Sequence, residues 1–153
     1  MTKTLILIRH AHALSRYESA VPTDSARMLS AQGRQKALQS AQDLLARQEK
    51  PQIILTSPLL RALQTAQIAS EVLNAPVKQQ PILDGFHPDA QVRDFLLGEL
   101  TRYDCILAVG HNPCITYVTA LLCGQVYPFA PASFALLRAE HAQSPLQLIY
   151  FGE

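Results

Sequence analysis

The segment TLILIRHAHA, residues 4–13, decides the fold prediction because an aliphatic run stops abruptly at two polar residues. The run from Leu5 to Ile8 contains two β-branched isoleucines and is too short for a helix, so it predicts a buried strand. Arg9 and His10 then follow at the carboxyl end of that strand. The sequence therefore places a cation and a titratable ring at one edge of the expected sheet.

Further apolar runs alternate with helical patterns along the rest of the chain. Strands are expected at 53–56, 76–79, 105–110, 133–139 and 146–151, the last two joined by a turn near 143–145. Helices are expected from the N-cap Ser30 to residue 50, from the N-cap Ser57 with Pro58 in its first turn to residue 74, over 89–100, and from Pro113 onward. The segments 12–29 and 81–90 are expected to be loops.

The alternation of strands and helices predicts one α/β domain over residues 1–153. Helices should cover both faces of a mainly parallel sheet in three layers, because strands buried on both faces read as continuous apolar runs.

Composition excludes several classes of protein. The chain has 153 residues, 48% of them hydrophobic, with a formal net charge of +1. This near balance and the absence of a basic stripe argue against a nucleic-acid partner. The apolar run near the start is shorter than that of a signal peptide, and no stretch reaches transmembrane length, so we expect a cytoplasmic protein without a membrane partner. The three cysteines match no metal-ligand spacing and are expected to be reduced residues of the core.

Polar residues follow three of the expected strands at the same structural position. Arg9 and His10 end the first, the 53–56 strand leads through Ser57 to Arg61, and His111 ends the 105–110 strand. Ligands of open α/β sheets bind outside the carboxyl ends of the strands. If these strands are neighbours, two arginines and two histidines meet in one crevice.

This set of side chains suits phosphoryl transfer. Arginines such as Arg9 and Arg61 donate paired hydrogen bonds to phosphoryl oxygens, and a neutral His10 can act as the nucleophile. His111 would donate a further hydrogen bond, and the helix starting at Pro113 adds free backbone N–H groups around Asn112. The sequence has no glycine-rich phosphate loop and no aspartate cluster for magnesium, so we expect a route without metal or cofactor.

Four segments together resemble the histidine phosphatase superfamily, which is also called the phosphoglycerate-mutase-like or RHG family. They are LIRHA (7–11), RMLSAQGRQKA (27–37), TSPLLRALQTA (56–66) and AVGHNP (108–113). The short chain, without an inserted helical cap, is similar to the compact SixA-type phosphohistidine phosphatases. The resemblance implies that His10 is the phosphorylated nucleophile, that Arg9 and Arg61 clamp the phosphate, and that His111 is the second histidine of the pocket with the Asn112 backbone nearby.

Two positions depart from the family pattern. Ala11 stands where a glycine usually follows the Arg-His pair, which we interpret as a mark of the compact branch. The acidic proton donor of the larger members has no clear counterpart. Asp84 occupies its approximate place in the chain and is either a turn former beside Gly85 or a general acid. We interpret His12, His87 and His141 as surface or loop residues.

The expected function is hydrolysis of a phosphoryl group through a phosphohistidine enzyme. The favoured substrate is phosphohistidine in a protein, such as a signalling phosphotransfer domain. The alternatives are a small-molecule phosphomonoesterase and a phospho-ligand binding module without catalysis. A mutase is disfavoured because it needs a cap to retain its intermediate. Since attack requires neutral His10, activity should fall at low pH.

Overall fold

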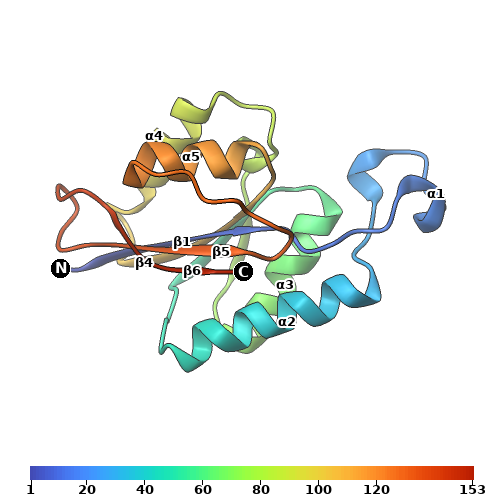
Figure 1. The fold of residues 1–153 in the computed structure, drawn as a ribbon, viewed down its shortest axis with the longest axis horizontal. Helices are drawn as coiled ribbons and strands as arrows, with labels where there is room; N and C mark the ends of the chain where they lie inside the picture. The colour runs from blue at the N-terminus through green and yellow to red at the C-terminus, as the bar shows by residue number, and fades with distance from the viewer.

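The computed structural model describes residues 1–153 and contains one six-stranded sheet (Figure 1). The strand order is β3-β2-β4-β1-β5-β6. Neighbouring strands among β3, β2, β4 and β1 pair in parallel, whereas β5 pairs antiparallel with both β1 and β6. The strands are β1 (Lys3–Arg9), β2 (Ile53–Thr56), β3 (Val77–Gln79), β4 (Cys105–Gly110), β5 (Phe134–Ala139) and β6 (Gln147–Gly152). The predicted α/β class with a mainly parallel sheet is confirmed.

Helices cover both faces of the sheet, as predicted for three layers. Helices α4 (Asp89–Glu99) and α5 (Cys114–Cys123) lie on one face, and α2 (Ala31–Ala46) and α3 (Leu60–Leu73) on the other (Figure 1). Successive residues of β1 serve the two layers alternately: Leu5 and Leu7 belong to the core beside α4 and α5, and Ile6 and Ile8 to the core beside α2 and α3. Burying each of these side chains contributes roughly 1.5–3 kcal/mol. The uninterrupted aliphatic run is therefore the signature of a strand with no solvated face.

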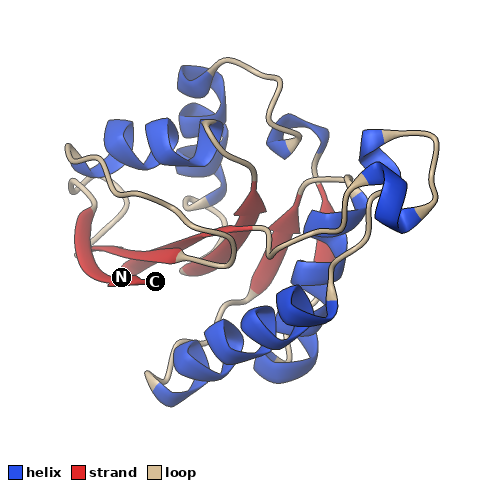
Figure 2. Cartoon of the chain, turned by 45° about the vertical axis from the view of Figure 1, so that its right-hand side comes forward, coloured by secondary structure: helices blue, strands red, loops and turns tan.

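The segment 12–29, which was predicted to be a loop, contains short helical elements. It holds the one-turn helix α1 (Arg16–Ser19) and the 3₁₀ turn η1 (Asp24–Ala26), and it projects from the body of the molecule (Figure 2). Ser15 and Glu18 form a capping box on α1, which buries no residue. A helix of four residues shows no periodicity in sequence, so local capping alone specifies it. The other predicted loop contains a second 3₁₀ turn, η2 (Pro81–Leu83).

Two predicted helix starts need correction. Ser30 does cap α2, accepting a hydrogen bond from the Gly33 N–H at 2.9 Å. Helix α3, however, begins at Leu60, and Ser57 and Pro58 lie before it. The Ser57 hydroxyl accepts from the Leu59 N–H at 3.1 Å and so forms a turn that precedes the helix. Helix α5 likewise begins after Pro113, at Cys114.

The chain leaves the central strands in opposite directions. Strands β1 and β4 are parallel neighbours, with Arg9 paired to Gly110 at their carboxyl ends. The first helix of the body after β1 is α2 on one face, and the helix after β4 is α5 on the other. Ligands of open α/β sheets bind beyond the carboxyl ends of strands at such a divergence, and we call this region, next to Arg9 and Gly110, the crevice. None of the helices is long and apolar enough to cross a membrane.

Candidate active site

The crevice brings together the histidines that the sequence placed at the ends of two strands. The ring centroids of His10 and His111 are 5.0 Å apart, with their planes inclined by 52°. Arg61 reaches the same region from the first turn of α3 and is buried, and its charge and that of Arg9 both act on the His10 ring. The predicted convergence of Arg9, His10, Arg61 and His111 is therefore present in the structure.

His10 has a defined tautomer. Its Nδ1 lies 2.7 Å from the carbonyl oxygen of Ala11, which can only accept a hydrogen bond, so Nδ1 carries the proton. Burial lowers the pKa of His10 to about 3; the bond to Ala11 opposes this change, and the charges of Arg61, Arg9 and a protonated His111 add to it. The ring is consequently neutral at pH 7, and its Nε2 bears a free lone pair.

His111 is more deeply buried than His10. Its Nε2 lies 2.7 Å from the Ser57 hydroxyl, whereas its Nδ1 is buried and has no partner in the protein. Burial lowers the pKa of His111 to about 4; Arg61 lowers it further, and the negative charges of Asp84 and Asp24 oppose the change. His111 is thus a second neutral imidazole with one unsatisfied nitrogen.

Arg9 presents a further unsatisfied donor. Its Nη1 donates to the Phe129 carbonyl at 2.8 Å, but its Nε is buried without a partner. Burial lowers the pKa of Arg9 below its ordinary value, and the guanidinium remains a cation at pH 7. Buried polar groups are rarely left unpaired. The unpaired nitrogens of Arg9 and His111 therefore indicate a site for an exogenous acceptor such as an oxyanion.

The side chain of Asn112 is hydrogen-bonded within the protein. Its side-chain amide donates to the Phe129 carbonyl at 3.0 Å, and its side-chain oxygen accepts from the Thr116 hydroxyl at 2.7 Å. The carboxamide is thus engaged in holding the loop before α5. The backbone N–H of Asn112 is available for a phosphate, as predicted from the sequence.

Arg61 has a partner that the sequence did not indicate. Its Nη1 donates to the carbonyl of Asp24 and its Nη2 to the carboxylate of Asp24, both at 3.0 Å. The other carboxylate oxygen of Asp24 accepts from Arg27 at 3.0 Å, and the Arg27 bond is the main cause that lowers the pKa of Asp24. The projecting segment therefore fixes two nitrogens of the Arg61 guanidinium, and the Nε of Arg61 makes no hydrogen bond to the protein.

Asp84 lies near the site, on the loop that packs against His111. A Cβ added to Gly85, whose φ is +91°, would lie 3.2 Å from the His111 Cβ. The Asp84 Oδ1 accepts from the Phe86 N–H at 2.8 Å and faces the His87 Nδ1 at 3.0 Å. Asp84 thus forms the expected turn, and its second carboxylate oxygen has no hydrogen-bond partner. The role of general acid stays a prediction.

The remaining candidates lie outside the crevice or belong to the core. The ring of exposed His12 contacts the Ser30 hydroxyl at 2.8 Å, and His141 is exposed. All three cysteines are free; Cys114 is buried, and burial raises the pKa of its thiol to about 12. No group of three or more His, Cys, Asp or Glu side chains could hold a metal ion.

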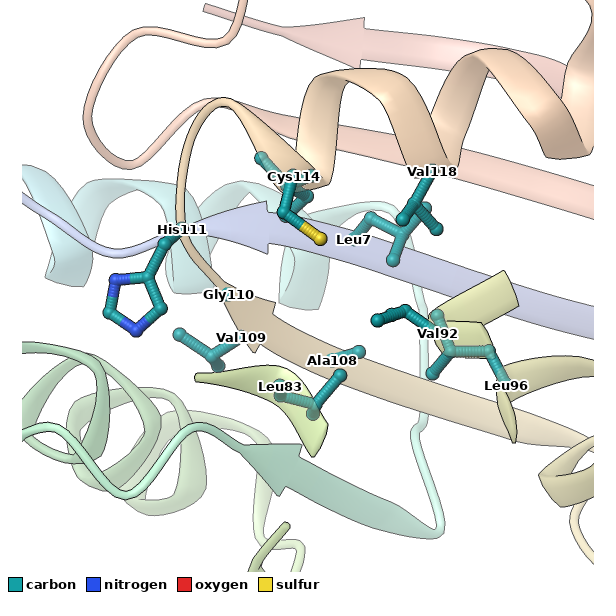
Figure 3. A pocket seen from close by; sticks show the side chains of 11 residues that line it. Leu7, Leu83, Val92, Leu96, Ala108, Val109, Gly110, His111, Cys114 and Val118 are labelled. Carbon is teal, nitrogen blue, oxygen red and sulfur yellow. The ribbon is translucent and has the colours of Figure 1, made fainter. Parts of the chain in front are cut away.

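An apolar pocket behind His111 is distinct from the crevice. It has a volume of about 20 Å³, which suffices for one water-sized molecule. Figure 3 shows His111 at one end of it, with the ring nitrogens turned away from Leu83, Val92 and Leu96. This pocket is part of the packing between the sheet and helices α4 and α5.

Sequence reasoning missed three groups of the site. Ser57 ends β2 in the way that His111 ends β4, so its place at a strand end could have revealed it. Asp24 lies in a segment without periodicity, and the carbonyl of Phe129 has no sequence signature at all. Both are located only by the tertiary fold.

A comparison with protein families identifies the family of the chain. The model of the Histidine phosphatase superfamily (branch 1) matches residues 5–88. The chain belongs to the histidine phosphatase superfamily. The matched range includes Arg9, His10 and Arg61, whereas His111 lies beyond it and reaches the site through the pairing of β1 with β4. As a histidine phosphatase, the protein is an enzyme that acts on a phosphorylated substrate.

Solved structures of similar fold include several phosphatases. The protein histidine phosphatase SixA in complex with tungstate is 23% identical, with a TM-score of 0.87 over 98% of this chain and 96% of that one. A protein assigned as the phosphohistidine phosphatase SixA from Agrobacterium tumefaciens is 20% identical, with a TM-score of 0.85 over 99% and 97%. Mycobacterial glucosyl-3-phosphoglycerate phosphatase is 18% identical, with a TM-score of 0.73 over 97% and 98%. These likenesses establish the phosphoglycerate-mutase-like fold. No curated protein sequence matches the chain.

Proposed function

We propose that this histidine phosphatase hydrolyses phosphohistidine in a protein through a phosphohistidine intermediate on His10. The observation that supports the proposal most strongly is the free Nε2 lone pair of His10, which is fixed by the Ala11 bond in the site that contains the unpaired Arg9 Nε and His111 Nδ1. A neutral imidazole held in this way is ready for nucleophilic attack.

The first half-reaction transfers the phosphoryl group to the enzyme. The Nε2 of His10 attacks phosphorus in line as the bond between phosphorus and the leaving nitrogen of the substrate breaks. Arg9, Arg61, His111 and the Asn112 N–H donate to the phosphoryl oxygens and stabilise their charge. The departing imidazole takes up a proton, for which Asp84 is the candidate donor.

The second half-reaction restores the enzyme. Water attacks phosphorus, the bond to Nε2 of His10 breaks, and inorganic phosphate leaves. The cations Arg9 and Arg61 serve both steps, because the same oxygens are held throughout. We propose that neither step needs a metal ion.

Two features favour a protein substrate. The crevice lies beside the partly exposed loop 84–88, and the chain has no inserted helical cap between its strands. The fold is also that of a protein histidine phosphatase that binds tungstate, a tetrahedral oxyanion. A signalling phosphotransfer domain in the cytoplasm is the partner that we propose. A small-molecule phosphomonoesterase is the second candidate, since glucosyl-3-phosphoglycerate phosphatase has the same fold.

Substrate profiling in the presence of EDTA tests the proposal. Initial rates are measured with a phosphohistidine protein, sugar monophosphates and nucleotide monophosphates, for the unmodified enzyme and for His10→Asn. His12→Asn is the matched control, because His12 is exposed and bonded to Ser30 outside the crevice. We expect the highest kcat/KM with the phosphohistidine protein, its loss in His10→Asn and its retention in His12→Asn.

Each other outcome of this assay contradicts one part of the proposal. A higher kcat/KM for a monophosphate than for the phosphohistidine protein favours the phosphomonoesterase. Binding of phosphorylated ligands without turnover indicates a binding module. Loss of activity in EDTA contradicts the metal-free route.

A further inference from the structure

The Ser57 hydroxyl occupies a position that the proposed reaction does not itself require. Ser57 is 0% exposed and follows β2 directly. Its Oγ lies 2.7 Å from the His111 Nε2 and 3.1 Å from the Leu59 nitrogen. A buried hydroxyl in contact with a titratable ring beside a reaction centre is a means of controlling the proton on that ring.

The hydrogen-bond pattern decides where each proton lies. The Leu59 N–H is a donor, so the Ser57 oxygen accepts from it and still has its own proton to donate. The other recorded partner of this oxygen is the Nε2 of His111, and leaving a buried hydroxyl proton unpaired costs about 1–3 kcal/mol. The hydroxyl therefore donates to Nε2. Because His111 is neutral, its single ring proton then resides on Nδ1.

The Nδ1 of His111 is the nitrogen that has no partner in the protein. It is buried, and its ring lies 5.0 Å from that of His10, measured between centroids. An N–H group at this position lacks an acceptor until a ligand supplies one. An oxygen of a phosphoryl group on the Nε2 of His10 can accept this hydrogen bond.

We propose that Ser57 is a positioning residue that holds His111 as the Nδ1–H tautomer, so that a neutral imidazole donates to the phosphoryl oxygen. The tautomer follows from the contacts of Ser57, whereas the identity of the acceptor rests on the proposed function. His111 then differs from Arg9 and Arg61 in giving a hydrogen bond without adding a third positive charge. The site can thus release phosphate more easily than a site with three cations could.

Nitrogen NMR tests the tautomer without any turnover. Two-bond ¹H–¹⁵N correlation spectra of the full chain, labelled at histidine, distinguish protonated from bare ring nitrogens; His111→Asn assigns the signals. At pH 7 we expect a protonated Nδ1 and a bare Nε2 for His111, and a shift of the Nδ1 signal when tungstate is added. A protonated Nε2, an imidazolium, or an Nδ1 signal that tungstate leaves unchanged would overturn the proposal.

Variants of Ser57 supply the kinetic test. Ser57→Ala should lower kcat/KM about tenfold and convert His111 to a mixture of tautomers, whereas Ser57→Thr, which keeps the hydroxyl, should restore the single tautomer. Ser70→Ala is the control, because its hydroxyl donates to the Ala75 carbonyl at the far end of α3. An unchanged His111 spectrum in Ser57→Ala overturns the positioning role. If the tautomer is observed but no phosphorylated compound is hydrolysed, the proposed function fails and the assignment of the tautomer stands.

Discussion

Acidification should destabilise the protein through the two histidines of the site. In the unfolded chain a histidine has a pKa of about 6.5. In the folded protein burial lowers the pKa of His10 to about 3 and that of His111 to about 4. Between about pH 6.5 and these lower values, the two histidines are protonated in the unfolded state but neutral in the folded state. Full stability therefore exists above about pH 6.5 and declines as the pH falls toward the folded values.

The size of the effect follows from the same values. Each histidine removes about 1.4 kcal/mol per pH unit below its unfolded pKa, which amounts to about 2 kcal/mol at about pH 5. His10 and His111 together should lower the free energy of unfolding by about 4 kcal/mol between pH 7 and about pH 5. Most carboxylates titrate below this interval, with ordinary pKa values of about 3.9 and 4.3.

Urea denaturation at pH 7, about pH 6 and about pH 5 measures this loss. The unmodified protein should lose about 4 kcal/mol over the interval, and His10→Asn and His111→Asn should each lose about 2 kcal/mol. His12→Asn is the control and should behave as the unmodified protein, because His12 is exposed. Stability that is constant over the interval, or a full loss in His10→Asn, would refute the assignment of buried neutral rings.

Three substitutions test other contacts of the site. Arg61→Lys removes the planar guanidinium that binds Asp24, and kcat/KM should fall roughly 10- to 100-fold while the circular dichroism spectrum stays unchanged. An unaltered kcat/KM would contradict the role of Arg61 in binding phosphate. Asp24→Asn removes the negative charge next to Arg61, so the inhibition constant of inorganic phosphate should fall about fivefold. A higher inhibition constant would contradict this prediction. Gly85→Ala places a methyl group at a φ of +91° and 3.2 Å from the His111 Cβ, which should reduce the free energy of unfolding by about 1–2 kcal/mol in urea; equal stability would argue against the close approach.

The sequence predicts the layers well because each strand has a strong local signal. The strand at 105–110 appears with the predicted bounds, and the one at 53–56 likewise, since both faces of each are buried and the apolar run has no interruption. Helix starts were less well predicted. Ser57 resembles an N-cap in sequence, but its hydroxyl is hydrogen-bonded to the Leu59 N–H and to His111, and α3 begins at Leu60, two residues after the predicted first residue Pro58.

The site was predicted from the rule that ligands bind at the carboxyl ends of parallel strands. This rule finds residues that follow strands and misses residues in other segments. His10 and His111 follow strands that prove to be adjacent, so the rule places them together. Asp24 cannot be found in this way, because its approach to Arg61 is set by the path of the projecting segment and not by a strand. Asn112 illustrates a further limit: the sequence gives its position, whereas only the structure shows that the Phe129 carbonyl and Thr116 engage its side chain.

The covalent state of the enzyme during turnover shows whether His10 is the nucleophile. The reaction with a phosphohistidine protein is quenched in alkali within milliseconds, digested, and the peptide containing His10 is sequenced by mass spectrometry. We expect a phosphoryl group on the ring of His10, transient in the unmodified enzyme and absent in His10→Asn. A phosphoryl group on any other residue, or rapid turnover with His10 unmodified throughout, would contradict this expectation.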